Sequence, residues 1–125
     1  MPVLVNEVLA NSTLPEVDAV IACGDTKASV RLKNGIQCDL RAVSNAQFPF
    51  ALQYFTGSKE HNVALRSLTL KNGLSLNEYG FTGETAANFE INEEADIYRA
   101  LDLEYIEPEL RENHGELEAA EQIVA

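Results

Sequence analysis

Two alternating segments on either side of an Asn-Gly pair constrain the fold more than any other feature of the chain. In residues 27–32 every second side chain is apolar, and residues 36–43 begin with the same alternation. This pattern is typical of strands that bury one face. A two-residue turn at Asn34-Gly35 would place apolar side chains opposite polar ones on both faces. A three-residue loop at 33–35, with Gly35 left-handed, makes one face of the hairpin apolar and the other polar.

The three-residue loop predicts a specific register between the two strands. It places Val30 opposite Cys38 and Ser29 opposite Asp39. The alternate side chains then form one polar face, which consists of Lys27, Ser29, Arg31, Gln37, Asp39 and Arg41. The sequence therefore predicts an antiparallel hairpin whose polar face is a candidate functional surface.

The rest of the chain mixes helical and extended patterns, which favours an α+β fold. Ser58 is a suitable N-cap for a helix, and Gly73 is a suitable left-handed residue to end it. The predicted elements are a helix at 3–9, a strand at 17–23, helices at 48–55 and 59–72, a strand at 74–79, a loop at 82–88, a helix that is capped by Asn92 and carries Ile97, Tyr98, Leu101 and Leu103, and a Glu-rich helix or linker at 109–124.

The net charge of −11 is distributed unevenly along the chain. Residues 1–80 carry balanced charges, whereas residues 81–125 hold 13 acidic and 2 basic residues. The segment 24–80 is locally basic, with 7 basic and 4 acidic residues. Because the excess acid lies in the last third, the total charge does not exclude a nucleic-acid partner. We expect the tail to be a solvated acidic element or an interface.

Cysteine usage and hydropathy indicate the class of protein. Cys23 and Cys38 are too few for a disulfide framework and have no neighbours at metal-ligand spacing, so we predict two buried thiols in a reduced, cytoplasmic protein. No run of eighteen apolar residues is present, and Glu7 interrupts the first apolar stretch. We therefore expect neither a membrane partner nor a signal peptide.

The segment 52–66, LQYFTGSKEHNVALR, carries more specific information. It resembles the start of the thumb in family X DNA polymerases, the group that includes DNA polymerase beta. Its residues are most similar to those of the bacterial members. Further elements follow the order of that family. They are GDTK at 24–27, DLR at 39–41, NEY at 77–79, IYRAL at 97–101 and YIEPELR at 105–111.

The resemblance implies an antiparallel palm-strand meander, the end of a nucleotidyltransferase palm, followed by an α/β thumb of the polymerase beta type. The implied boundaries are 1–46 for the palm segment, 47–112 for the thumb and 113–125 for an acidic linker toward an absent phosphoesterase (PHP) domain. The Asp-x-Asp pair of the family is missing from this sequence. We therefore expect the parent protein to be a DNA polymerase and this chain alone to be inactive.

The resemblance also assigns a metal ligand and a conformational switch. From the residues alone, Asp39 fits a surface carboxylate paired with Arg41. The resemblance makes Asp39 the third carboxylate of the catalytic triad, a ligand of Mg²⁺ or Mn²⁺, although a single carboxylate holds no such ion tightly. It also makes Arg41 catalytic, as a switch that exchanges partners with Glu78 or Tyr79 when the thumb closes.

A nucleotide pocket is implied by residues of the 52–66 segment. By resemblance, Tyr54, Phe55 and Gly57 form the floor under the sugar of a deoxynucleoside triphosphate (dNTP) and disfavour a 2′-hydroxyl. Asn62 and Arg66 lie four residues apart on one helix face and match the groups that probe the minor groove. From the residues alone, the first three fit a hydrophobic helix end and the other two a solvated polar face.

The expected partners are gapped or primer–template DNA and dNTP, and the chain is expected to be a monomer. Gly24, Thr26 and Lys27 match a phosphate-contacting element of the palm, and Arg66 contributes to the DNA contact. The first hypothesis is thus a fragment of an enzyme for DNA-templated nucleotidyl transfer in short-gap or base-excision repair. The alternative is a non-catalytic DNA- or protein-binding module derived from a polymerase thumb.

Overall fold

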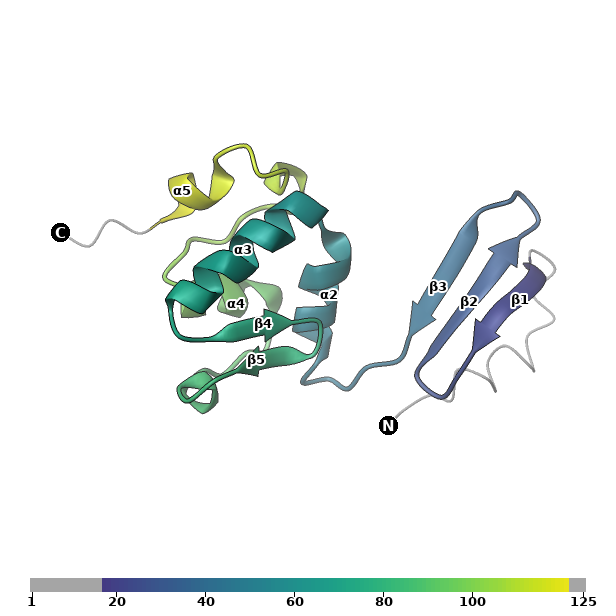
Figure 1. Ribbon diagram of the computed structural model, residues 1–125, viewed down its shortest axis with the longest axis horizontal. Helices are drawn as coiled ribbons and strands as arrows, with labels where there is room; N and C mark the ends of the chain where they lie inside the picture. Colours follow the sequence, from purple (N-terminus) through teal and green to yellow (C-terminus); the bar gives the residue numbers. More distant parts are fainter. Residues whose placement is uncertain (1–16, 122–125) are drawn as a thin grey trace. The chain divides into compact units, whose positions relative to one another are not determined.

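The computed structural model describes residues 17–121, which divide into two compact units between Ser44 and Asn45 (Figure 1). The helix predicted at 3–9 lies outside the described residues. Among those residues, no helix is long and apolar enough to cross a bilayer.

The first unit is a three-stranded antiparallel sheet in the order β1-β2-β3. Its strands are β1 (Val17–Cys23), β2 (Lys27–Leu32) and β3 (Gln37–Arg41). The predicted register is confirmed, since Val30 pairs with Cys38 and Ser29 with Asp39. The loop has three residues, and Gly35 adopts a positive φ of 88°. The choice of the loop that keeps polar and apolar faces separate was therefore sufficient to fix the pairing.

The thiol of Cys38 is exposed, so the prediction that it is buried was wrong. It lies on β3, an edge strand of the sheet whose five residues are all exposed. On the neighbouring β2, Ala28 and Val30 are buried. The apolar alternation thus identified the correct face of the hairpin, but burial on that face does not extend to β3.

The second unit opens with two consecutive helices, α2 (Phe48–Thr56) and α3 (Lys59–Lys71). As predicted, Ser58 is the N-cap of α3, and its hydroxyl accepts from the backbone N–H of His61 at 3.2 Å. Gly73, with φ 79°, follows the C-terminus of α3 in the left-handed conformation. Both helix ends are thus encoded by the residues next to them.

A short antiparallel hairpin follows α3, with strands β4 (Ser75–Asn77) and β5 (Gly80–Thr82). The sequence predicted one strand at 74–79 and missed β5. The side-chain oxygen of Asn77 accepts from the backbone N–H groups of Tyr79 and Gly80 at 2.8 and 3.1 Å, which closes the turn between the strands. A three-residue strand is too short to show alternation, so only this Asn-based turn indicated it.

Two short helical turns and one more helix complete this region, namely η1 (Ala86–Asn88), α4 (Glu94–Ala100) and η2 (Pro108–Leu110). The N-cap of α4 is Glu93 and not Asn92, because Glu93 and Asp96 form a reciprocal capping box. The carboxylate of Asp96 also accepts from the backbone N–H of Asn92 at 3.0 Å. Leu103 lies beyond the end of α4 and is buried in the core.

The core of the second unit gathers side chains from most of its elements. In Figure 1, α2, α3 and α4 lie close together beside the β4-β5 hairpin. The buried cluster consists of Phe50, Leu65, Leu76, Ile97, Tyr98, Leu101, Leu103, Ile106, Leu117 and Ala120.

A fully buried guanidinium, that of Arg111, adjoins this core. It forms a bidentate pair with the Glu94 carboxylate at 2.7 and 3.1 Å and donates twice to the Ile106 carbonyl at 3.0 and 2.8 Å. It also lies over the rings of Tyr98 and Tyr105, 5.1 and 5.5 Å from their centroids. Burial would lower the pKa of Arg111, but the hydrogen bonds that it donates to Glu94 raise it, so the group stays charged.

The acidic segment after residue 112, expected to be a linker, contributes a helix to the second unit. Helix α5 (Glu116–Ala120) buries Leu117 and Ala120, and the Ala120 carbonyl accepts from Glu104 N–H at 2.9 Å. The carboxylate of Glu116 lies 2.5 Å from Nδ1 of His61, whose ring is fully buried. Acidic composition indicated solvent exposure, but the buried positions lie between the glutamates.

We predict that Glu94→Ala lowers the free energy of unfolding by about 3–5 kcal/mol, because it leaves the buried Arg111 charge without its partner. Arg99→Ala is the matched control on the same helix. The Arg99 side chain is 61% exposed in its pairs with Glu93 and Asp96, so its loss costs less than about 1 kcal/mol. Urea titrations of both variants measure the difference, and equal losses would contradict the structural role given to the buried pair.

We also predict a pH-dependent contribution of Glu116 to stability. Burial alone would raise its pKa, but hydrogen bonds from His61 and from the backbone lower it from 4.5 to about 2. The stabilisation is therefore complete above pH 4.5 and is lost as the pH falls toward 2, with an upper limit of about 3 kcal/mol.

Denaturant titrations between pH 2 and 7 of the unsubstituted chain and of Glu116→Gln measure this contribution as the difference in their free energies of unfolding. This difference should shrink as the pH falls. Glu118→Gln, at an exposed position of the same helix, is the control and should follow the unsubstituted chain. A free-energy difference between the unsubstituted chain and Glu116→Gln that stays constant over this range would refute the assignment.

Candidate functional site

The polar face of the first unit carries the predicted metal ligand. Asp39 on β3 accepts from the side chain of Gln37 at 3.0 Å and pairs across the sheet with Ser29. Hydrogen bonds from Gln37 and then from Ser29 lower the pKa of Asp39, and the charge of Arg41 lowers it further. Asp39 is therefore an ionised, exposed carboxylate at neutral pH.

The residues present do not by themselves fit a complete site for Mg²⁺ or Mn²⁺. Such ions take several oxygen ligands, commonly more than one carboxylate. Within residues 17–121, no three His, Cys, Asp or Glu side chains come together in an arrangement that could hold a metal ion. Asp39 can therefore supply one ligand, and no chemical step can be derived through a metal from these residues.

The residues of the predicted conformational switch lie in both units. Arg41 lies on the polar face of β3, where its charge acts on Asp39. Glu78 and Tyr79 form the turn of the β4-β5 hairpin in the second unit. Their exchange of partners with Arg41 stays a prediction.

The turn that joins β1 to β2 contains Gly24 and Thr26 and is followed directly by Lys27, the first residue of β2. It is closed by a bond of 2.8 Å from Gly24 N–H to the Lys27 carbonyl, and all three residues are exposed. Arg31, on the same face of β2 as Lys27, pairs with Asp18 on β1 at 3.2 Å. A phosphate contact by the turn stays a prediction.

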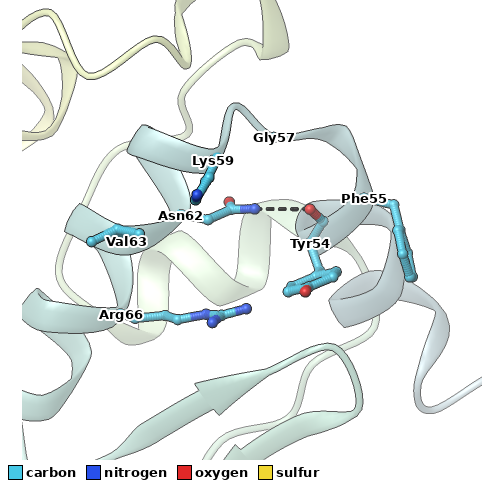
Figure 2. A pocket seen from close by; sticks show the side chains of 7 residues that line it. All are labelled: Tyr54, Phe55, Gly57, Lys59, Asn62, Val63 and Arg66. Atoms are coloured by element: carbon cyan, nitrogen blue, oxygen red, sulfur yellow. Dashed lines mark hydrogen bonds between the residues drawn. The ribbon is translucent and has the colours of Figure 1, made fainter.

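The second unit contains a cleft of about 430 Å³ between the C-terminal half of α2 and the N-terminal half of α3. Figure 2 shows the residues that line it, which are Tyr54, Phe55, Gly57, Lys59, Asn62, Val63 and Arg66. The structure thus brings together every residue of the predicted nucleotide pocket. Lys59 and Val63 also belong to this lining.

The side-chain amide of Asn62 is held from two sides. Its Nδ2 donates to the Tyr54 carbonyl at 2.8 Å, the bond drawn in Figure 2, and its Oδ1 accepts from Nε2 of Gln53 at 2.9 Å. Asn62 is 9% exposed and Gln53 is 3% exposed. The amide therefore has one fixed orientation at the cleft, with one Nδ2 hydrogen left for a ligand.

Arg66 reaches across the cleft toward Tyr54. Its guanidinium lies over the Tyr54 ring, 4.9 Å from the centroid, as Figure 2 shows. The ring of Tyr54 in turn packs against Phe55 edge to face, with centroids 4.9 Å apart. The two aromatic side chains and the arginine thus form one wall, with a cation whose donors are available to an acceptor.

The turn between α2 and α3 forms another part of the cleft lining. Gly57 has a φ of 74°, a conformation that side chains rarely adopt, and the Gly57-Ser58 peptide is cis. The backbone N–H of Ser58 donates to the Arg111 carbonyl at 2.9 Å. The cleft lining is therefore attached directly to the segment that carries the buried Arg111.

A buried polar network behind the cleft was missed at the sequence level. Nε2 of His61 lies 3.0 Å from the hydroxyl of Tyr98. Burial raises the pKa of Tyr98 to about 12, against the opposing effects of the Arg111 charge and a hydrogen bond with Gln53. The members of this network come from α2, α3, α4 and α5 and share no local spacing. The only sequence signal was the adjacent polar pair His61-Asn62 close to the N-terminus of α3.

Comparisons with known proteins agree with this geometry. Residues 51–112 match the family described as DNA polymerase beta thumb. The chain is 41% identical over 108 residues to DNA polymerase/3'-5' exonuclease PolX of Bacillus subtilis, an alignment that covers 84% of this chain and 19% of that protein. It is 39% identical over 100 residues to human DNA-directed DNA/RNA polymerase mu, over 78% of this chain and 20% of that protein.

The fold also matches solved structures. A ternary primer–template complex of Leishmania infantum polymerase beta aligns with a TM-score of 0.72 and 23% identity, over 90% of this chain and 55% of that chain. The predicted α+β class is thereby confirmed. The chain spans about a fifth of the length of the curated relatives it matches.

We predict that Asn62→Ala lowers the free energy of unfolding by about 1–3 kcal/mol, since it leaves the buried Gln53 amide and the Tyr54 carbonyl without their partner. Ser67→Ala is the control, because its exposed hydroxyl bonds only to the Val63 carbonyl of the same helix. Its effect should stay within about 0.5 kcal/mol. Thermal unfolding measures both, and an Asn62→Ala variant as stable as the control would argue against a fixed amide.

Proposed function

The chain belongs to family X of the DNA polymerases, and on that premise we propose that its second unit binds the DNA minor groove and an incoming dNTP. The parent protein then performs DNA-templated nucleotidyl transfer in short-gap or base-excision repair. The observation that carries this proposal is the cleft in which the fixed amide of Asn62 and the guanidinium of Arg66 face the same space.

The two donors suit a ligand whose acceptors lie at constant positions. In the minor groove, every correct base pair presents acceptors at similar places, so one pair of donors can test shape without reading sequence. The donors lie one helical turn apart on α3 and point toward the cleft. The fixed orientation of Asn62 lowers the entropy cost of binding such a ligand.

The sugar of the nucleotide would lie against the α2–α3 turn. Tyr54, Phe55 and Gly57 line this part of the cleft, which fits the proposed floor under a deoxyribose. The absence of a Cβ at Gly57 lets the backbone come close to the ligand. A 2′-hydroxyl would then meet ring and backbone atoms, and the site would favour deoxynucleotides.

The first unit would contribute to the chemistry through Asp39. As an ionised carboxylate it can supply one oxygen to Mg²⁺ or Mn²⁺, and the remaining ligands would have to come from outside the described residues. In this proposal Arg41, on the same strand face as Asp39, keeps the role of a switch partner for Glu78 and Tyr79.

The proposal is tested by the binding of duplex DNA with a one-nucleotide gap to the chain, at low ionic strength. We predict that Arg66→Ala weakens binding about tenfold, the loss of one charge-assisted contact. Lys71→Ala is the matched control, because it removes one positive charge from the same helix at an exposed position outside the cleft. It should weaken binding by less than about threefold.

Fluorescence anisotropy of labelled DNA measures both affinities. If the two variants lose affinity equally, binding is a general charge effect and the cleft is not the site. If the unsubstituted 125-residue chain shows no binding at low salt, the proposed role of this unit in DNA contact is wrong.

A further inference from the structure

A buried polar network, made of two hydrogen-bonded groups, leads from the C-terminal segment to the amide of Asn62. It begins at Glu116 on α5, whose Oε2 lies 2.5 Å from Nδ1 of His61. The other ring nitrogen of His61 lies 3.0 Å from the Tyr98 hydroxyl. Gln53 donates to Asn62 at 2.9 Å, and hydrogen bonding by the Gln53 side chain lowers the pKa of Tyr98, which links these two residues.

The network is buried along its whole length. His61 and Tyr98 are 0% exposed, Gln53 is 3% exposed, and the Glu116 side chain is 7% exposed. None of the buried side-chain polar atoms among the described residues lacks a hydrogen-bond partner. A buried network in which every member is satisfied has few alternative arrangements, because any rotation leaves a group without a partner.

The position of Glu116 is itself fixed by the segment before α5. Its carboxylate accepts from the backbone N–H of Asn113 at 2.9 Å and from that of His114 at 2.7 Å. The same segment contacts the cleft lining a second time, since the Arg111 carbonyl accepts from Ser58 N–H. The segment 111–116 therefore contacts both the N-cap of α3 and the network that orients Asn62.

We propose that Glu116, His61, Tyr98 and Gln53 are positioning residues that fix the donor geometry of Asn62 from behind the cleft. The segment 111–116 is then part of the nucleotide- and DNA-binding unit, and whatever displaces α5 weakens binding at the cleft. This inference rests on the proposed function only for its effect on affinity. The effect on the orientation of Asn62 holds for the free chain.

The decisive variant is Tyr98→Phe, which removes the hydroxyl in the middle of the network and keeps the ring in the core. Tyr105→Phe is its matched control. Tyr105 also packs beside Arg111, but its hydroxyl bonds only weakly to Glu94, at 3.4 Å, and lies outside the network. Glu116→Gln tests the end of the network without changing the core.

The first measurement is the NMR signal of the Asn62 side-chain amide in the free 125-residue chain. Tyr98→Phe and Glu116→Gln should shift this signal and speed its hydrogen exchange, whereas Tyr105→Phe should leave it unchanged. An unshifted Asn62 signal in Tyr98→Phe would overturn the proposal, whether or not the chain binds DNA.

The second measurement is the affinity for the gapped duplex at a temperature where all variants are folded. Tyr98→Phe should weaken binding about three- to tenfold, equivalent to one hydrogen bond, and Tyr105→Phe should not. In an Asn62→Ala background, Tyr98→Phe should have no further effect, because Tyr98 acts through Asn62.

Additive losses in the double variant would overturn the positioning role, since a merely structural tyrosine would weaken both backgrounds alike. If the unsubstituted chain fails to bind the duplex while Tyr98→Phe still shifts the Asn62 signal, the proposed function is wrong and the network stands. The two failures are thus distinguishable.

Discussion

The buried charge of Arg111 is the constraint on which the second unit depends. A guanidinium without contact to water is tolerated only if charge and hydrogen-bonding partners surround it. Here Glu94 supplies the carboxylate, Ile106 supplies a carbonyl, and two tyrosine rings cover the faces. These partners come from α4 and from the segment after it. The C-terminal segment must therefore fold back onto α4, and this path brings α5 to the core.

The same fold-back determines where the cleft can form. With the Arg111 side chain fixed, its carbonyl meets the backbone N–H of Ser58 at the start of α3. Helix α3 begins there, and the N-cap hydroxyl of Ser58 and the buried ring of His61 fix its first turn. Asn62 is the next residue. The helical turn that carries this donor is thus anchored, through Ser58, to the backbone of the residue that forms the buried charge pair, which agrees with the preference of functional groups for rigid elements.

Features encoded by neighbouring residues were predictable, and features that join distant residues were not. The β2-β3 register followed from alternation and a glycine, and both ends of α3 followed from single residues, Ser58 and Gly73. The residues of the cleft were predictable because they are contiguous in the sequence and resemble a known family. The Arg111–Glu94 pair and the contact of His61 with Glu116 have no local signature. For α5 the sequence left a Glu-rich helix and a linker open, and its acidic composition gave no sign that Leu117 and Ala120 join the core.

The two donors of the cleft differ in how they are prepared for a ligand. Asn62 is held by bonds to Gln53 and to the Tyr54 carbonyl, so a ligand finds its remaining N–H already oriented. Arg66 is stacked on the Tyr54 ring and only partly buried, so it can leave that position at a modest cost. A fixed donor suits the invariant part of a base pair, whereas a movable cation can follow the duplex. Since Tyr54 contacts both residues, by its carbonyl and by its ring, movement of α2 would change both donors together.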